Sequence, residues 1–183
     1  MPTFGTANSK SDLDGILSLQ KANHVQSLSA SEIQSQGFVT VNHSYEQLKN
    51  LNDIEKHVIA KAEDRIIGYV LAMTQRSRYD IPILLPMFDA FDKIIYKGKK
   101  ISEYHYIVVG QVCIDKIFRG TGVFNKCYSA YKECYQDRYD FAITEIAARN
   151  TRSLQAHRRI GFKEINSYSA PDKTEWIVVI WDW

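Results

Sequence analysis

The sequence predicts one layered α/β (α+β) domain in which helices flank a single mixed sheet. Its 183 residues suffice for one sizeable core and are few for two. Apolar residues make up 45% and charged residues 24%, as in ordinary globular proteins. Segments of helical and of strand periodicity follow one another as a strand, two or three helices, a hairpin, a helix, a strand, a helix, a strand, a helix and two strands. Such a succession is typical of a layered domain.

The first part of the chain is expected to be mainly helical. PTFGTA can form a short strand. The segment 9–23, SKSDLDGILSLQKAN, combines Ser and Asp caps with spaced leucines and is typical of a helix. SASEIQSQGF predicts a shorter helix that ends at Gly37, and SYEQLKNL is a third candidate helix.

The middle of the chain changes period. HVIAKAEDRIIGYVLAMT predicts two strands joined by a polar turn at Glu63 to Arg65. PILLPMFDAFDKII is apolar at helical spacing, with a proline near its start. Residues 104–115, YHYIVVGQVCID, predict a strand rich in β-branched and aromatic residues. Gly110 lies inside this strand, where a glycine often marks a bulge or a close approach to the backbone.

The last third of the chain predicts alternating helices and strands. VFNKCYSAYKECY has one apolar face and indicates an amphipathic helix. FAITEIAA is almost continuously apolar, as expected of a strand covered on both faces. NTRSLQAHRRI is a helix capped by Asn150 and ended by Gly161. FKEINSY and TEWIVVIWDW close the chain as two strands, and the aromatic-rich second one could either pack in the core or contribute to a homodimer interface.

Composition argues against several classes of partner. The net charge of +2 indicates neither a polybasic nucleic-acid surface nor an acidic tail. No apolar run approaches the ~18 residues of a membrane span, and MPTFGTANSK shows no secretory signal. Three cysteines without a C-x-x-C pair favour reduced thiols and a cytoplasmic location. The five histidines show no metal-ligand spacing, so no metal site is expected.

The segment FRGTGVFNK connects the strand 104–115 to the following helix. Gly120 and Gly122 allow a tight turn that points successive N–H groups into one concavity. The first turn of the helix adds unsatisfied N–H groups and the positive end of its dipole, which together suit a phosphate or pyrophosphate. Arg119 can add a bidentate contact. An ordinary strand-to-helix turn explains the same residues, and the spacings G-x-x-x-x-G-K-[ST] and G-x-G-x-x-G are both absent.

A second segment downstream, EIAARNTRSLQAHRRIGFKEI, completes a pattern of two motifs. Together they resemble the GNAT superfamily of acyl-CoA-dependent N-acetyltransferases, through Arg119-Gly120-Thr121-Gly122 and then Asn150, Ser153, His157 and Gly161-Phe162. The first motif resembles that family's R/Q-x-x-G-x-G/A pyrophosphate loop. The second resembles its N-x-x-[A/S]-x-x-x-Y-x-x-x-G-F helix. The motif-bearing part runs from about residue 104 to 162, while residues 1–56 carry no specific match.

The resemblance implies a single GNAT-like domain over residues 1–183. The expected sheet is central, mixed and mostly antiparallel, with six to seven strands flanked by helices. A splay is expected between the cofactor strand (about 104–115) and the next strand (about 140–148). Residues 1–56 would supply the acceptor-side helices, and residues 104–162 the acyl-CoA-binding core.

The resemblance also implies acetyl-CoA as the cofactor and assigns residues to it. Backbone N–H groups of the loop and the first helical turn would hold the pyrophosphate, namely those of Gly120, Thr121, Gly122, Val123 and Phe124. The backbone of Val112, Cys113 and Ile114 would pair with the pantetheine arm as an added strand, and Asn150 and Ser153 would line the same arm. Phe124 stands where the family usually has Gly or Ala, so its side chain must point into the core.

Two residues are candidates for the chemistry. Glu145 lies in the apolar strand FAITEIAA, where burial raises the pKa of a carboxyl toward that of a useful base. It matches the glutamate of the L-E-V strand in the ribosomal-protein acetyltransferases, although a salt-bridged or edge-facing carboxylate is the alternative. His157 stands where the family often has a tyrosine acid, and it is either a proton donor or a satisfied core residue. An N–H near Gly110 could stabilise the oxyanion.

The leading hypothesis is transfer of an acetyl group from acetyl-CoA to a primary amine of a small molecule, peptide or protein. Direct attack in a ternary complex is preferred over an acyl intermediate on Cys113, because no histidine is near that residue in the sequence. A non-catalytic acyl-CoA-binding sensor and a scaffold domain without a CoA site are the alternatives. The sequence leaves the acceptor open. Acidic and aromatic side chains before and within the cofactor strand would suit a cationic amine or form a solvated face, namely Tyr79, Asp80, Asp89, Asp92, Tyr104 and Tyr106.

Overall fold

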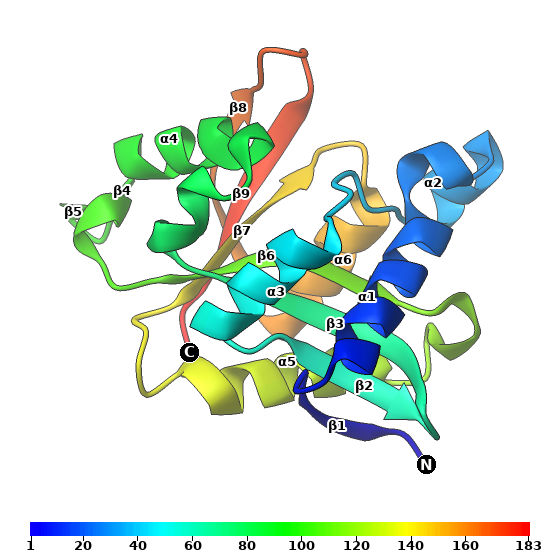
Figure 1. Ribbon diagram of the computed structural model, residues 1–183. Helices are drawn as coiled ribbons and strands as arrows, with labels where there is room; N and C mark the ends of the chain where they lie inside the picture. Colours follow the sequence, from blue (N-terminus) through cyan, green and yellow to red (C-terminus); the bar gives the residue numbers. More distant parts are fainter.

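The computed structural model describes residues 1–183, apart from the side chain of Gln34 (Figure 1). The strands are β1 Thr3–Thr6, β2 Val58–Ala62, β3 Arg65–Met73, β4 Ile95–Tyr96, β5 Lys99–Lys100, β6 Ile107–Ile114, β7 Ala142–Ala147, β8 Lys163–Ser169 and β9 Glu175–Trp181. The α-helices are α1 Lys10–Asn23, α2 Ala30–Gln36, α3 Tyr45–Ile54, α4 Leu85–Lys93, α5 Val123–Tyr135 and α6 Thr151–Ile160. Short 3-10 turns are η1 Val25–Ser27, η2 Gln75–Tyr79, η3 Pro82–Leu84, η4 Ile101–Glu103 and η5 Lys116–Phe118.

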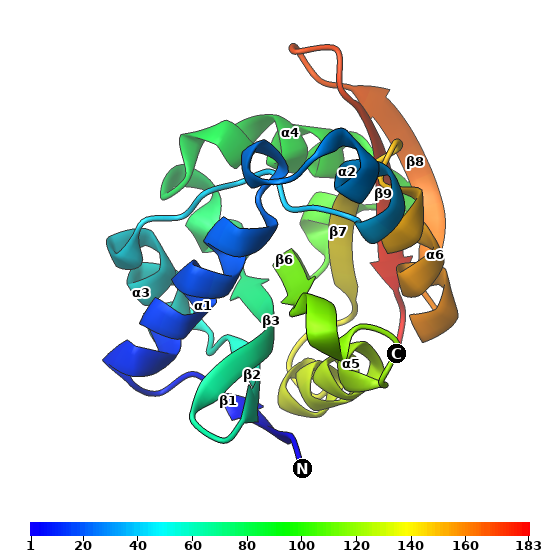
Figure 2. The same cartoon turned by 90° about the vertical axis from the view of Figure 1, so that its right-hand side faces the viewer.

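The central sheet has seven strands in the described part of the chain, in the order β1-β2-β3-β6-β7-β9-β8. Among these strands β6 and β7 form the parallel pair, and the other neighbours are antiparallel. The β6–β7 register covers only Ile107 opposite Ala142 and Val108 opposite Ile143. Beyond these pairs the two strands diverge, as Figures 1 and 2 show. The predicted single-domain mixed sheet and its splay are therefore confirmed.

Helices cover both faces of the sheet. Helices α1, α3 and α4 lie in front of it in Figure 1, whereas α5 and α6 lie behind it. The side chains of β7 alternate accordingly: Ala142 and Ile146 pack in the cluster that contains α5 and α6, and Ile143 packs in the cluster that contains α4. Glu145 has the parity of Ile143, so it points toward the α4 side.

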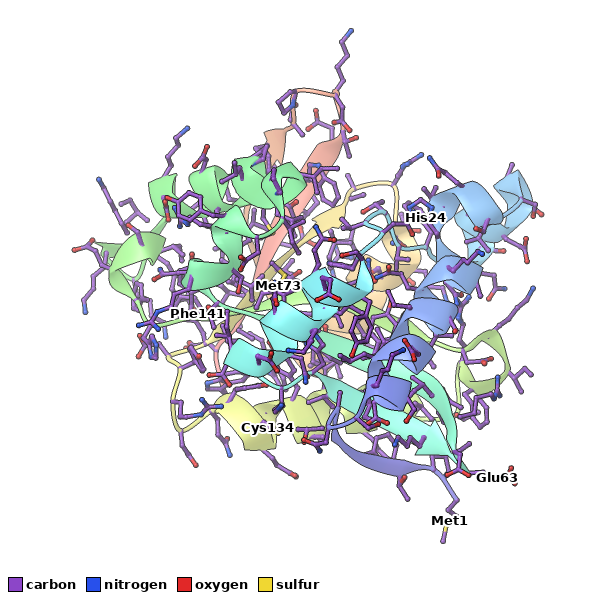
Figure 3. The ribbon with its side chains drawn as sticks, viewed as in Figure 1. Met1, His24, Glu63, Met73, Cys134 and Phe141 are labelled. Carbon is purple, nitrogen blue, oxygen red and sulfur yellow. The ribbon has the colours of Figure 1, made fainter. Side chains whose placement is uncertain are left out.

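Gly110 forms a bulge at the beginning of the splay. The register of β3 against β6 shifts there, with Leu71 opposite Gln111 but Ala72 opposite Val109. A Cβ atom on Gly110 would lie 2.2 Å from Sδ of Met73, so close approach explains the glycine. Figure 3 shows Met73 near the middle of the molecule, with Glu63 at the far turn of the β2–β3 hairpin. The bulge expected from the sequence is confirmed.

The other predicted elements are also confirmed, with three local differences. The strand expected from residue 104 begins at Ile107. Before it, the backbone N–H of Asp140 donates to the carbonyl of His105, which joins the loops that precede β6 and β7. The helix expected over residues 82–95 is divided into η3 and α4. A small β4–β5 hairpin follows, turning at Lys97 and Gly98, which both have positive φ. In the part of the chain that is described, no helix has the length and apolar character needed to cross a membrane.

Candidate active site

The loop between β6 and α5 adopts the conformation that its glycines allow. Gly120 and Gly122 have φ angles of 80° and 87°, in the left-handed region that favours glycine. Gly122 is the N-cap of α5 and has no side chain to accept hydrogen bonds from the first turn. The N–H groups of that turn are therefore not capped by a side chain, and the positive end of the α5 dipole lies at the same place.

A groove of about 520 Å³ runs along β6 past this loop to α6. It is lined by most of the residues predicted to hold the cofactor, namely Val112, Cys113, Ile114, Arg119, Gly120, Gly122, Phe124, Asn150 and Ser153. Thr121 and Val123 do not line it, since the Thr121 hydroxyl donates to the Phe118 carbonyl and Val123 is buried in the core. The structure thus gathers two distant segments of the sequence around one groove.

Phe124 packs inward from the first turn of α5. Its ring lies 5.0 Å from the ring of Tyr128 and 5.5 Å from that of His157, measured between centroids. The side chain is half-buried: it packs against α6 and also lines the groove. Of the basic residues nearby, Arg158 pairs with Glu164, whereas Arg159 lines the groove.

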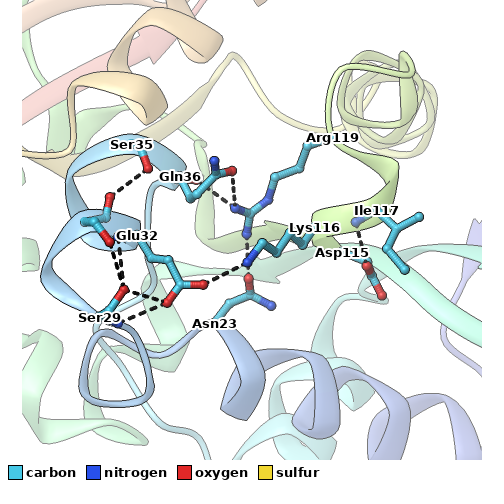
Figure 4. Close-up of polar contacts among 10 residues, drawn as sticks. Asn23, Ser29, Glu32, Ser35, Gln36, Asp115, Lys116, Ile117 and Arg119 are labelled. Atoms are coloured by element: carbon cyan, nitrogen blue, oxygen red, sulfur yellow. Dashed lines mark hydrogen bonds and ion pairs between the residues drawn. The ribbon is translucent and has the colours of Figure 1, made fainter.

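The side chain of Arg119 holds the loop to the N-terminal helices. Its guanidinium donates to the carbonyls of Ile114 and Gln36, each at 3.0 Å, and to Oδ1 of Asn23. Figure 4 shows the contacts with Gln36 and Asn23 beside the ion pair between Lys116 and Glu32, whose Nζ–Oε1 distance is 2.8 Å. All three guanidinium nitrogens of Arg119 therefore donate to neutral oxygen atoms of the protein, and the side chain positions the loop.

Asn150 has two structural roles at the start of α6. Its Oδ1 accepts from the backbone N–H of Ser153 at 3.4 Å, which caps the helix as predicted. Its Nδ2 donates to the Phe38 carbonyl at 3.1 Å, and Arg152 donates to the Ser35 carbonyl at 3.1 Å. The chain around α2 thus contacts α6 as well as the β6–α5 loop, and it closes one side of the groove.

A smaller cavity of about 90 Å³ continues from the groove through the splay. Val112, Asn150 and Ser153 line both spaces. The cavity is also lined by the bulge at Gly110 and by both candidate catalytic residues, Glu145 and His157. These two side chains come from opposite faces of the sheet, and they share a cavity because the sheet is open between β6 and β7.

Glu145 is the ionisable residue best suited to take a proton here. Burial raises the pKa of its carboxyl to about 7, and the hydrogen bond from Tyr168 partly opposes that shift. The Tyr168 hydroxyl on β8 donates to Oε2 of Glu145 across the intervening strand β9. A carboxyl with a pKa near neutrality can accept a proton and return it at physiological pH.

His157 is buried, and both of its ring nitrogens have partners. Nε2 lies 2.6 Å from the Tyr128 hydroxyl, and Nδ1 lies 2.8 Å from the Ser153 carbonyl. Because a carbonyl can only accept, Nδ1 carries the proton and Nε2 accepts from Tyr128. Burial lowers the pKa of His157 to about 4, so the ring is neutral at pH 7.

Three solved structures place the fold. The chain superposes on a GNAT-family acetyltransferase from Streptococcus agalactiae with a TM-score of 0.69 and 10% identity, over 100% of this chain and 95% of that one. The ribosomal-protein-S18-alanine N-acetyltransferase from Escherichia coli superposes with a TM-score of 0.63 and 10% identity, over 100% of this chain and 94% of that one. A chain of the NatC complex bound to Gag peptide and CoA superposes with a TM-score of 0.65 and 11% identity, over 100% of this chain and 98% of that one. The chain has the GNAT fold.

The resemblance predicted from two short motifs is thereby confirmed for the fold. No protein-family model and no curated protein matches the sequence. The groove and the cavity of this GNAT fold lie at the splay, where the two motifs face one another.

The cysteine of β6 is a poor nucleophile in this setting. Cys113 is buried, and burial raises the pKa of its thiol to about 12. Its thiolate is therefore scarce at neutral pH. Cys113 is therefore poorly suited to carry an acyl group.

Two features of the site were missed by sequence reasoning. Tyr168 reaches Glu145 only because β8 and β9 pair antiparallel beside β7, which the spacing of the chain does not reveal. The second feature is Gln111. Its Oε1 accepts hydrogen bonds from the Tyr69 hydroxyl and, at 2.8 Å, from the Gln20 side-chain amide. Its Nε2 donates to the Val41 carbonyl at 3.0 Å. This buried network fixes the wall of the cavity that comes from the α2–α3 connection. The sequence offered one signal for this network, namely a polar residue, Gln111, directly after the expected bulge at Gly110.

Proposed function

We propose that this protein is an N-acetyltransferase that transfers an acetyl group from acetyl-CoA to a primary amine by direct attack in a ternary complex. The observation that carries the proposal is the Glu145 carboxyl, whose pKa is about 7, in the cavity that opens into the groove. Among the similar structures, the NatC complex has CoA bound, and an acetyltransferase from Salmonella typhimurium was solved with its cofactor acetyl-CoA.

The residues of the groove fit an acyl-CoA. The first turn of α5, left without a side-chain cap at Gly122, offers N–H donors to a pyrophosphate. β6 pairs with β7 only at Ile107 and Val108, so the edge of β6 at Val112 and Cys113 is not paired with β7 and would pair with an extended pantetheine arm. The Ile114 carbonyl at the end of this edge already accepts from Arg119. Ser153 lines both the groove and the cavity and would lie beside that arm.

Proton removal is the step assigned to Glu145. An alkyl ammonium has a pKa of about 10.4, so almost none of it is nucleophilic at neutral pH without a base. The carboxylate takes this proton, and the freed nitrogen lone pair attacks the thioester carbonyl carbon. The C–S bond then breaks as the carbonyl re-forms, and the surplus proton on the nitrogen passes to the departing thiolate, which leaves a neutral amide and free CoA thiol. Backbone N–H groups at the Gly110 bulge would stabilise the intervening oxyanion.

His157 acts in this proposal as a positioning residue. At neutral pH its Nδ1–H is bonded to Ser153 and its Nε2 accepts from Tyr128, so it has no spare proton to donate. The leaving thiol has an ordinary pKa of about 8.5, so departure as the thiolate needs no strong acid. The histidine instead ties α6 to α5 beside the cavity.

The direct test is amine-dependent release of free CoA thiol, with the acetylated amine identified by mass spectrometry. Wild-type protein is expected to release one CoA for each acetyl group transferred. Glu145→Gln is expected to bind acetyl-CoA with unchanged affinity and to lose most of the turnover. Thermal stabilisation by acetyl-CoA without any amine-dependent release would favour the binding module without catalysis. Absence of both effects would contradict the proposal.

A further inference from the structure

The wall of the cavity on the α4 side is apolar. Beyond Glu145 it is formed by Val41 from the α2–α3 connection, by Leu84 and Met87 at the start of α4, and by Trp176 on β9. Leu84 and Met87 are buried, and Trp176 shares the strand parity of Val178, whose side chain lies in the α4 cluster. An acyl-CoA in the groove approaches from the α5–α6 side. This apolar wall is therefore left for the acceptor.

Charge in the cavity is confined to the reacting position. Among the lining residues, whose side chains the structure describes, Glu145 is the sole carboxylate, and the other ionisable group is the neutral His157. The acidic residues that sequence reasoning considered for a cationic acceptor are elsewhere. Asp92 forms a bidentate pair with Arg78 at 2.9 and 3.1 Å, and Asp89 is exposed and does not line the cavity.

Three polar side chains of the wall are already engaged with the protein. The Thr144 hydroxyl donates to the Val109 carbonyl at 2.7 Å. The Gln111 amide has partners at both ends, as does the Asn150 amide. A second ammonium group in the cavity would therefore meet no anion besides the reacting Glu145 and no uncommitted acceptor amide. Burying such an unpaired charge is costly.

We infer that the acceptor is a primary amine carried on a short, uncharged, largely apolar group, with no second cation near the reacting nitrogen. This inference rests on the proposed function and narrows it. The cavity of about 90 Å³ admits the amine-bearing end of such a molecule. The chemistry is shared by a small apolar amine and by a peptide amino terminus whose first side chain is apolar. Polyamines and aminoglycosides do not fit it.

Matched amines test the inference with wild-type protein. Pentylamine and 1,5-diaminopentane differ by one terminal amino group, and the tripeptides Leu-Gly-Gly and Lys-Gly-Gly form the corresponding peptide pair. With acetyl-CoA as donor, we expect the uncharged member of the preferred pair to have a kcat/KM at least about tenfold higher than its cationic partner. Whichever pair is faster identifies the source of the amine. Equal or greater kcat/KM for the cationic members would overturn the inference while the proposed function stands.

Variants at Val41 connect the preference to this wall. Val41 is half-buried, so a polar residue there is tolerated better than at Leu84 or Met87. Val41→Asp is expected to narrow the gap between pentylamine and 1,5-diaminopentane about tenfold, since it adds an anion. Val41→Asn introduces a side chain of nearly the same shape as aspartate but without the charge. It is expected to leave the ratio of the two kcat/KM values unchanged. Equal effects of both variants would contradict the assignment of the wall. Failure of every amine to release CoA would remove the proposed function together with this inference.

Discussion

Replacing Glu145 with glutamine is expected to remove a pH dependence that the carboxyl imposes on acetyl transfer. The pKa of Glu145 is about 7, raised by burial, and the active form is the carboxylate. The active fraction is therefore about 10% at pH 6 and about 90% at pH 8. The rate supported by the base should rise about tenfold over this interval and level off above it. General-base catalysis contributes about 100-fold or more, so that loss is expected at pH 8.

The assay compares the two proteins at each pH with one amine. Because the carboxylate acts on the bound ammonium, the wild-type rate follows the ionisation of Glu145, whereas Glu145→Gln can use only the free amine and its rate keeps rising with pH. Thiol release at saturating acetyl-CoA and amine, measured between pH 5.5 and 9, should increase about tenfold from pH 6 to pH 8 in the wild type and then level off, while the variant should show no plateau in this range. A wild-type rate without this plateau, or a variant as fast as the wild type, would refute the role of Glu145 as the base.

Three other substitutions test separate parts of the account. Tyr168→Phe removes a donor that stabilises the Glu145 carboxylate, so the acid limb of the rate profile should move up by about one pH unit, with rates restored near pH 9; an unmoved limb would show that the hydrogen bond has no effect. Gly122→Ala forces a side chain into left-handed backbone at a cost of about 1–2 kcal/mol, so Tm in a thermal melt should fall by about 3–6 °C, and an unchanged Tm would contradict the loop conformation. Gly110→Ala should lower the free energy of unfolding by about 1–2 kcal/mol in urea, because the new methyl group meets Met73. In a background that already carries Met73→Ala, the same substitution should cost less; an equal cost in both backgrounds would disprove the contact.

Most of the fold could be predicted because its signals are local. The glycines at 122 and 161 both adopt left-handed backbone at helix ends, and Asn150 caps α6, so these boundaries are set by residues within one turn of the helix. The pairing of the two motifs around a groove followed from the order of the elements. Burial of Glu145 followed from the apolar strand around it, and the structure raises its pKa as expected.

The rest of the site depends on contacts between distant segments, which no local pattern encodes. Tyr168 meets Glu145 across a third strand, and Arg119 turns away from solvent to carbonyls more than 80 positions earlier in the chain. The burial of His157, which removes it from proton donation in our proposal, is set by aromatic rings from α5 and from Phe162. The small β4–β5 hairpin was missed because Lys97 adopts positive φ, which is uncommon for that residue.

The central claim is that the groove and the cavity form one acetyl-transfer site. The most direct measurement is the rate of CoA release from acetyl-CoA with and without pentylamine, with quantification of N-acetylpentylamine in the same sample. We predict release that depends on the amine, equals the acetylated product mole for mole, and falls about 100-fold at pH 8 in Glu145→Gln. Release that is independent of every amine tested, or that occurs without an acetylated product, would contradict the claim.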